Sequence, residues 1–293
     1  MARVLLIANP AAARNRPLAV KAILDTFRTA GWITELSETG GPGDARRLAA
    51  EGVTAGMDVV AVFGGDGTTM QAASSLVGTE VSLGVIPGGT GNLLAGNLRI
   101  PTAPVRATQA LLAGRPRRFD LGRVERADGV HYFAVACGAG YDARVMAGTP
   151  AALKRRWKIG AYLATTVRLL GELRLARHRI SVDGVEFDAE AAMVLVANCG
   201  EVIPPFIRLR RGIRPDDGVL DVVVIRANNF RQSVRAVWHL LREMENGYVA
   251  YARGHEVHVV SEPAEPVQLD GEPGGTTPFA ASVVPGAICI MTQ

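Results

Sequence analysis

The chain has 293 residues, of which 48% are hydrophobic and 20% are charged, and its formal net charge is +4. This length suits one large or two medium domains, and the apolar content is ample for packed cores. No uncharged apolar run is long enough to span a membrane, and the N-terminus lacks the pattern of a signal peptide, so we expect a cytoplasmic protein. The three cysteines are far apart and form no CxxC or Cys/His cluster, which argues against disulfides and zinc.

The first part of the chain alternates apolar strands with helical segments. Val4–Ala8 is predicted to be a buried strand that ends at Asn9 and Pro10, because an Asn-Pro pair stops a strand. Helical spacing follows from Leu18 to Ala30, and residues 32–37 supply a second strand. This alternation indicates an α/β domain with a parallel sheet.

The stretch Asp58–Gln71, DVVAVFGGDGTTMQ, joins a strand to a helix. Residues 59–63 form an uninterrupted apolar run, which is typical of a strand buried on both faces. The glycines at 64, 65 and 67 can take positive φ and let a ligand approach the backbone, and the amides at the helix start favour a phosphate. Asp66 would repel a bare phosphate, so it indicates a magnesium-borne charge or an acceptor for a hydroxyl group. A tight turn with a capping Asp is the alternative.

A second glycine cluster follows the next apolar strand. Residues 81–86 form this strand, and PGGTGN occupies residues 87–92. Two strands of a parallel sheet end at the same edge, where open α/β sheets bind ligands. We therefore expect the two glycine loops to share one pocket.

The paired loops resemble the signature of the diacylglycerol kinase catalytic-domain family, in its bacterial lipid kinase branch, which also includes sphingosine-kinase-like proteins. GGDGT at residues 64–68 and PGGTGN with the following LA carry the resemblance, and the pair is far more specific than either half. It extends over nearly the whole chain. The resemblance implies a Rossmann-like α/β domain of the NAD-kinase and diacylglycerol-kinase type, followed by a mainly antiparallel β-sandwich domain.

The resemblance also implies a nucleotide site along three loops at the sheet edge. The residues assigned to it are Asn9, Pro10, Ala11, Ala12, Ala13, Thr39, Gly64, Gly65, Asp66, Gly67, Thr68, Thr69, Met70, Gln71, Gly88, Gly89, Thr90, Gly91 and Asn92. Some positions depart from the family pattern. Ala12 and Ala13 replace the usual Ser and Gly, Met70 and Gln71 replace Asn-Glu, and Leu93 stands where a subset of relatives has Asp.

A composition break separates the two predicted domains. The basic segment 114–118 contains Gly and Pro, so we place the boundary near residue 121, with domains 1–121 and 122–293. Short alternating strands follow at residues 122–126 and 131–137, joined by a turn at Asp128 and Gly129. This pattern is typical of antiparallel sheets.

The resemblance places magnesium at two positions. Asp120 corresponds to an acid that faces the interdomain cleft in the family, and we expect Mg²⁺ near Asp66 and Asp120. The turn at 214–219 corresponds to a structural magnesium site, with the carboxylate of Asp217 and the carbonyls of Arg214 and Val219 as implied ligands. Oxygen-only ligation suits a hard divalent ion, although a plain Asp-rich turn is the alternative.

Two late acids, Asp270 and Glu272, flank a glycine on a predicted strand and turn. In extended structure, side chains two residues apart share one face. One carboxylate could then accept the proton of an incoming hydroxyl while the other orients metal or base. The resemblance to the family's Asp-Gly-Glu implies that the catalytic base is one of these two, with Asp66 as a further catalytic residue. An ordinary β-turn is the alternative.

We therefore predict an ATP-dependent lipid kinase that transfers the γ-phosphate to a hydroxyl of a lipid such as diacylglycerol or a sphingoid base, with ATP and Mg²⁺ as cofactors. The expected partner is the lipid substrate, with no nucleic acid. A homodimer stays open, as does peripheral contact with the inner membrane surface, for which the basic cluster 154–158 and the apolar helix 159–170 are the candidate segment. Two other functions stay open: an NAD-kinase-like enzyme, and a non-catalytic nucleotide- or lipid-binding regulator.

Overall fold

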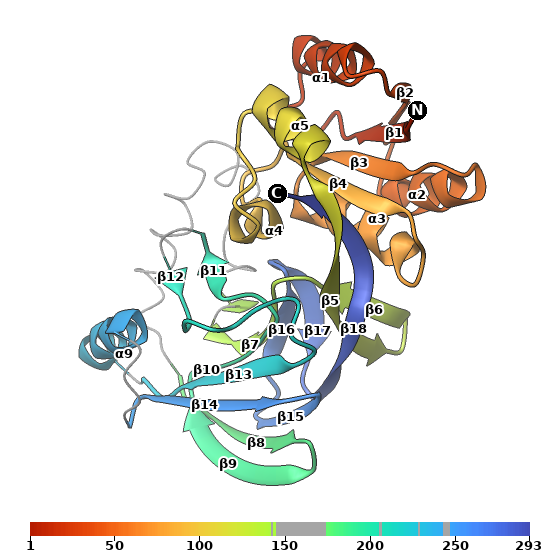
Figure 1. Cartoon of the computed structure of the whole chain (residues 1–293). Helices are drawn as coiled ribbons and strands as arrows, with labels where there is room; N and C mark the ends of the chain where they lie inside the picture. The colour runs from red at the N-terminus through yellow and green to blue at the C-terminus, as the bar shows by residue number, and fades with distance from the viewer. Residues whose placement is uncertain (142, 145–173, 205–206, 228, 243–246) are drawn as a thin grey trace. The chain divides into compact units, whose positions relative to one another are not determined.

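The computed structural model describes residues 1–141, 143–144, 174–204, 207–227, 229–242 and 247–293 (Figure 1). The chain forms two compact units, Met1–Phe119 with Gly286–Gln293, and Asp120–Pro285. This division differs from the predicted one, because the last eight residues return to the first unit. The candidate membrane segment at 154–170 lies outside the described residues.

The first unit contains a parallel sheet with the strand order β2-β1-β3-β4. The strands are β1 (Arg3–Ala8), β2 (Ile33–Glu38), β3 (Val59–Gly64) and β4 (Ser82–Pro87), and the end of β18 (Phe279–Thr292) runs parallel to β4. Every residue of β3 and β4 is buried. The apolar run 59–63 therefore predicted correctly that β3 is covered on both faces, and the second run predicted the strand β4.

Helices cover both faces of this sheet (Figure 1). They are α1 (Pro17–Thr29), α2 (Asp44–Thr54), α3 (Asp66–Leu76), the short α4 (Leu93–Asn97) and α5 (Pro104–Ala113). Helices α1 and α5 pack together over one core, which includes Phe27, Phe63 and Leu111. Helices α2 and α3 pack together on the other side, where Gly52 of α2 lies against Leu5 of β1.

The strand order places a topological switch point between β1 and β3. From β1 the chain moves outward to β2, and then returns to the opposite side of β1 as β3. Open α/β sheets bind ligands at the carboxyl ends of the strands beside such a point. The loops after β1, β3 and β4 all begin at this edge.

The second unit is built from antiparallel strands in two sheets. One contains β5 (Arg115–Arg126), β6 (Gly129–Phe133), β8 (Ala176–Val182), β9 (Val185–Ala191), β15 (Glu256–Glu262) and the first part of β18. The other has the order β14 (Val249–Gly254), β13 (Leu220–Ile225), β10 (Met193–Ala197), β7 (Ala136–Gly140), β16 (Pro266–Leu269) and β17 (Glu272–Thr276). The described residues of this unit also include the antiparallel pair β11 (Glu201–Ile203) and β12 (Ile207–Arg208) and the helix α9 (Phe230–Arg242).

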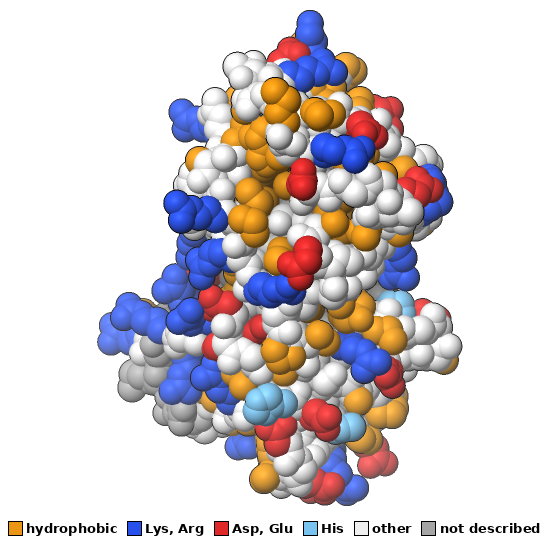
Figure 2. Space-filling view, turned by 45° about the vertical axis from the view of Figure 1, so that its right-hand side comes forward, with side chains coloured by type: hydrophobic (Ala, Val, Ile, Leu, Met, Phe, Trp, Pro, Cys, Tyr) orange, Lys and Arg blue, Asp and Glu red, His pale blue; other side chains and the backbone are white. Residues whose placement is uncertain are grey.

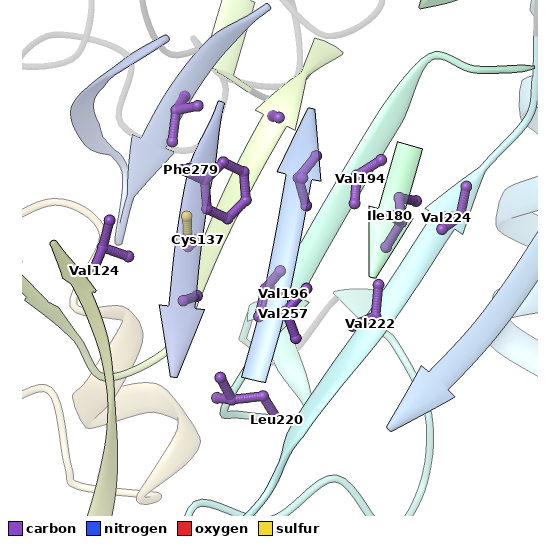
Figure 3. Packing of buried hydrophobic residues seen from close by; sticks show 14 of the residues in the cluster. Val124, Cys137, Ile180, Val194, Val196, Leu220, Val222, Val224, Val257 and Phe279 are labelled. Carbon is purple, nitrogen blue, oxygen red and sulfur yellow. The ribbon is translucent and has the colours of Figure 1, made fainter. Parts of the chain in front are cut away.

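Alternate residues of these strands form the sandwich core (Figure 3). Val194 and Val196 of β10 belong to one sheet, and Val257 of β15 and Ile180 of β8 belong to the other. Side chains two residues apart on a strand point to the same face, so each sheet contributes a regular apolar layer. The predicted β-sandwich is therefore confirmed.

The basic segment 114–118 lies beside the boundary between the two units, and β5 runs through it without a break from Arg115 to Arg126. One local prediction in this part of the chain was wrong. The strand predicted at 131–137 is divided between β6 and β7 at Ala134 and Val135.

Three further observations concern the surface, the cysteines and the helices. On the face in Figure 2, Lys and Arg side chains are most numerous along the left-hand edge, and acids are interspersed with them elsewhere. Cys137, Cys199 and Cys289 are buried free thiols, as their spacing predicted. Among the described residues, no helix combines the length and the apolar character that crossing a membrane requires.

Candidate active site

The two glycine loops of the first unit lie side by side, as the parallel sheet predicted. The amides of Gly88 and Gly89 donate to the carbonyl oxygen of Gly64 at 2.7 and 3.1 Å. A Cβ atom on Gly89 would lie 2.6 Å from the Cα of Gly65. None of Gly64, Gly65 and Gly67 has a positive φ. The close approach of the two backbones therefore requires a glycine at position 89, and Gly64, Gly65 and Gly67 do not use the left-handed conformations that glycine allows.

The loop after β1 is bonded to both glycine loops. The Asn9 side-chain amide donates to the Thr68 hydroxyl at 2.8 Å, and its carbonyl oxygen accepts from the Ala11 amide at 2.9 Å. The Arg14 amide donates to the Gly88 carbonyl at 2.9 Å. The loop therefore keeps its place despite the alanine at position 12, whose amide closes a turn onto the Asn9 carbonyl.

Asp66 links the GGDG loop to the second glycine loop. Its Oδ1 accepts a 2.6 Å hydrogen bond from the Leu93 amide, at the start of α4. A Cβ atom on Gly91 would lie 2.8 Å from its Oδ2. The carboxylate thus satisfies an amide of the neighbouring loop, and its position at the start of α3 is favourable for a negative charge.

Asn92 closes the second loop upon itself. It has a left-handed backbone, with φ of 51°, and its side chain accepts from the Gly89 amide and donates to the Gly89 carbonyl, both at 2.9 Å. Thr90 lies between them at the tip and is half-buried. The PGGTGN sequence therefore builds a rigid turn that presents Thr90.

Thr39 and Gln71 belong to the same edge. The Thr39 amide donates to the Ala8 carbonyl at 3.0 Å, which places Thr39 next to the end of β1. The Gln71 side chain accepts from the Gly43 amide at 3.1 Å, so it supports the loop after β2. An amide oxygen makes this bond as well as a carboxylate would, which explains how Gln71 is accommodated here.

The start of α3 is the centre of this edge. Its N-cap residue, Gly65, makes no side-chain capping bond. The first amides of a helix have no partner within the helix, and together with the helix dipole they favour an anion. The three loops therefore surround a helix N-terminus that is suited to a phosphate group.

Asp270 of the second unit is buried and fully engaged by backbone amides. Its carboxylate accepts bonds from Ala134 at 2.7 Å, Val135 at 2.8 Å and Ala136 at 2.9 Å. These bonds take the amides of residues 134 and 135 out of strand pairing, which explains the break between β6 and β7. Burial raises the pKa of Asp270 to about 6, while the three amides lower it in opposition.

Glu272 is exposed, although it is only two residues further along the chain. Asp270 and Gly271 both have positive φ, 47° and 85°, and they join β16 to β17 as a two-residue hairpin turn. Asp-Gly is the favoured sequence for this type of turn. The prediction that the two acids share one strand face is therefore wrong, because the turn separates a buried carboxylate from an exposed one.

Asn198 is a residue of this corner that the sequence reasoning missed. Its side-chain amide donates to the carbonyls of Asp120 and Ala134, both at 2.9 Å, and it is 1% exposed. Asn198 thus connects the segment that binds Asp270 with Asp120. A polar residue directly after a buried apolar strand was the available signal.

The turn at 214–219 is packed against Asp120. The Asp120 carboxylate accepts from the Gly218 amide at 2.7 Å, and its own amide donates to the Pro215 carbonyl at 2.7 Å. The Asp217 carboxylate pairs with Arg253, and Arg253 also lies 3.7 Å from Asp221. Within the described ranges, no group of three or more His, Cys, Asp or Glu side chains is arranged to hold a metal ion.

Known proteins resemble this chain over both units. Residues 3–124 match the diacylglycerol kinase catalytic domain, and residues 135–292 match the YegS C-terminal NAD kinase beta sandwich-like domain. A Chromohalobacter salexigens protein named as a probable YegS-like lipid kinase is 32% identical, covering 92% of this chain and 88% of the relative. The diacylglycerol kinase of Bacillus subtilis is 30% identical, covering 95% and 92%.

A solved structure gives the same result. The crystal structure of a Bacillus anthracis protein assigned as a diacylglycerol kinase has a TM-score of 0.83 at 25% identity, and the match covers 99% of this chain and 95% of that one. The resemblance inferred from the two glycine motifs is confirmed. The chain therefore belongs to the bacterial lipid kinase family whose members combine a diacylglycerol kinase catalytic domain with a YegS-type β-sandwich domain.

Proposed function

We propose that this chain is an ATP-dependent lipid kinase that transfers the γ-phosphate of ATP to a hydroxyl group of a lipid such as diacylglycerol or a sphingoid base. The observation that carries the proposal is the N-terminus of α3, which has no side-chain cap and is surrounded by the loops after β1, β3 and β4. Family membership supports the same activity.

The first unit supplies the nucleotide contacts in this proposal. The phosphates bind the amides at the start of α3 and in the second glycine loop, and Thr39 and Thr90 offer hydroxyl groups at the same edge. Phosphoryl transfer depends mainly on alignment and on neutralising charge. Asp66 acts by holding the two glycine loops at a fixed separation, because its Oδ1 binds the Leu93 amide.

Glu272 is the proposed general base of the second unit. Its carboxylate is exposed and accepts the proton of the lipid hydroxyl, while the hydroxyl oxygen bonds to the γ-phosphorus and the bond to the ADP oxygen breaks. Asp270 is a positioning residue, because its carboxylate is already occupied by three backbone amides. It fixes the hairpin turn from which Glu272 projects.

Magnesium is proposed at the turn 214–219, whose donors fit a hard cation. The Oδ2 atom of Asp221 is buried without a hydrogen-bond partner, and Asp217 and Asp221 share Arg253 as a counter-charge. With Asp217 and the carbonyls of Arg214 and Val219 as ligands, the ion would supply structural charge compensation. It would compete with Arg253 for Asp217, so we expect weak binding.

A transfer assay tests the proposed function. The protein is incubated with Mg²⁺ and γ-labelled ATP, with dispersed diacylglycerol, sphingosine or NAD in separate reactions, and the products are separated by chromatography. We expect label in a lipid product. Label in NADP alone would replace the proposal with an NAD-kinase activity, and ATP binding without any labelled product would indicate a non-catalytic regulator.

A further inference from the structure

Four exposed side chains of α9 lie along one face of the helix. They are Arg231, Arg235, Trp238 and Arg242, and we call them the α9 stripe. Their spacing of four, three and four residues is that of one helix face. Ser233 and Ala236 are buried, and the helix contacts β12 and β14 of its own unit (Figure 1). The stripe therefore faces away from the strands that α9 covers.

The α9 stripe is cationic, and the part of the chain that the structure describes places no acidic partner on it. The helix contains no acidic residue, and among the described residues no carboxylate forms an ion pair with its three arginines. Two exposed arginines elsewhere in this unit differ, since Arg177 and Arg179 of β8 lie 3.7 Å from Glu190 and Asp188. The next acids in the sequence, Glu243 and Glu245, are outside the described residues.

Trp238 adds an apolar group at the centre of the stripe. It is 53% exposed, and the guanidinium carbon of Arg242 lies 4.3 Å from the centroid of its ring. A tryptophan favours the headgroup level of a bilayer, where its ring is partly buried and its N–H stays hydrated. Arginine beside it can bury its stem while the charged group reaches lipid phosphates.

We propose that the α9 stripe docks this protein onto the surface of a bilayer that contains anionic phospholipid. The proposal rests on the proposed function only in that a lipid kinase finds its substrate in a membrane. The stripe is about 17 Å long at roughly 1.5 Å per residue, so it spans several lipid headgroups. The three arginines, which form no ion pair with any described residue, complement a negative surface, and the exposed indole favours a bilayer over a nucleic acid.

Vesicle co-sedimentation without ATP tests the docking surface. Wild-type protein is mixed with vesicles of phosphatidylcholine alone, or of phosphatidylcholine with phosphatidylglycerol. We expect binding to the anionic vesicles that weakens with salt. Since each basic residue near a surface contributes about fivefold to binding, Arg231→Gln/Arg235→Gln should bind about 25-fold more weakly. Trp238→Ala should weaken binding without changing its dependence on salt.

The double variant Arg177→Gln/Arg179→Gln is the matched control, because it removes the same charge from exposed arginines of the same unit. Equal losses in the two double variants, or wild-type binding in Arg231→Gln/Arg235→Gln, would overturn the docking surface. So would binding to duplex RNA in preference to anionic vesicles. A kinase assay on diacylglycerol dispersed in detergent keeps this test separate from the proposed function. Variants of the α9 stripe should retain wild-type activity in this assay. If the wild type itself is inactive in it, that result counts against the proposed kinase activity and not against the docking surface.

Discussion

Asp270 and Glu272 have opposite surroundings, although only Gly271 separates them in the sequence. Three amides occupy the Asp270 carboxylate, and the hairpin turn leaves Glu272 exposed. The sequence motif identified this acidic corner, but it left the choice of base open. The choice depends on contacts with residues 134–136, which are more than 130 positions away in the chain, so no local pattern could make it.

We expect Asp270→Asn to destabilise the protein. The asparagine offers one acceptor oxygen where the carboxylate offers two, so at least one buried amide loses its partner, at a cost of about 1–3 kcal/mol in the free energy of unfolding. Thermal unfolding at pH 7.5 measures this, with Glu272→Gln as the control that should unfold at the wild-type temperature. A wild-type midpoint combined with loss of turnover in Asp270→Asn would instead make Asp270 the base.

The Asp221 carboxyl should make the stability of the folded protein depend on pH. Burial raises its pKa to about 6, while Arg253 opposes the shift. Between pH 4 and 6 the folded chain then holds a proton that the unfolded chain has lost, so this residue's contribution to stability falls as pH rises through that window. Asp221→Asn cannot ionise, and relative to wild type its free energy of unfolding should increase by about 2–3 kcal/mol between pH 4 and pH 7.5.

Urea unfolding of both proteins at the two pH values, with EDTA present to remove bound metal, measures this difference. A difference between Asp221→Asn and wild type that is the same at pH 4 and pH 7.5 would show that the Asp221 carboxyl ionises normally in the folded chain.

At the scale of elements, the edge of the parallel sheet was the most predictable part of the molecule. Apolar runs and glycines are local signals, and parallel strands fix where their loops meet. The precise use of each glycine was not predictable, because the close approach of Gly65 and Gly89 depends on two loops that are 24 positions apart. The extension of β5 back to Arg115 was also missed, since β18, one of its two pairing partners, is distant in sequence.

Gly89→Ala should impair nucleotide binding by separating the glycine loops. The added Cβ would lie 2.6 Å from a backbone atom of Gly65, so the backbone itself must move, and overpacking of this kind costs about 1–3 kcal/mol. We expect a weaker Kd for ATP by isothermal titration calorimetry. Gly41→Ala, where a Cβ meets no atom within 4 Å, is the control. Wild-type affinity in Gly89→Ala would remove the second loop from the site.

At the scale of the whole molecule, each unit depends on segments from distant parts of the chain. The first unit is completed by the last eight residues, which lie beside β4. The residue pattern of β18 does not indicate which strand it pairs with. The sequence therefore led us to assign these last residues to the second domain. The two-domain class was predictable because the change from helical to alternating periodicity is visible in the sequence.

Ile290→Ala tests this completion of the first unit. Ile290 is 1% exposed and pairs with Leu83 of β4, so the cavity should cost about 2–5 kcal/mol. Thermal unfolding should show a lower midpoint, and saturating ATP should raise it again if the first unit binds the nucleotide. Gln293→Ala, at an exposed position, is the control. An unchanged midpoint in Ile290→Ala would show that the first unit does not need this strand.

The turnover of Glu272→Gln tests the central claim most directly. Rates of phosphate transfer from ATP to dispersed diacylglycerol are compared with wild type, alongside the Kd for ATP. Loss of a general base should lower kcat by about 10²- to 10⁴-fold and leave ATP affinity and the unfolding midpoint unchanged. A kcat equal to that of the wild type would contradict the assignment of Glu272 and the mechanism built on it.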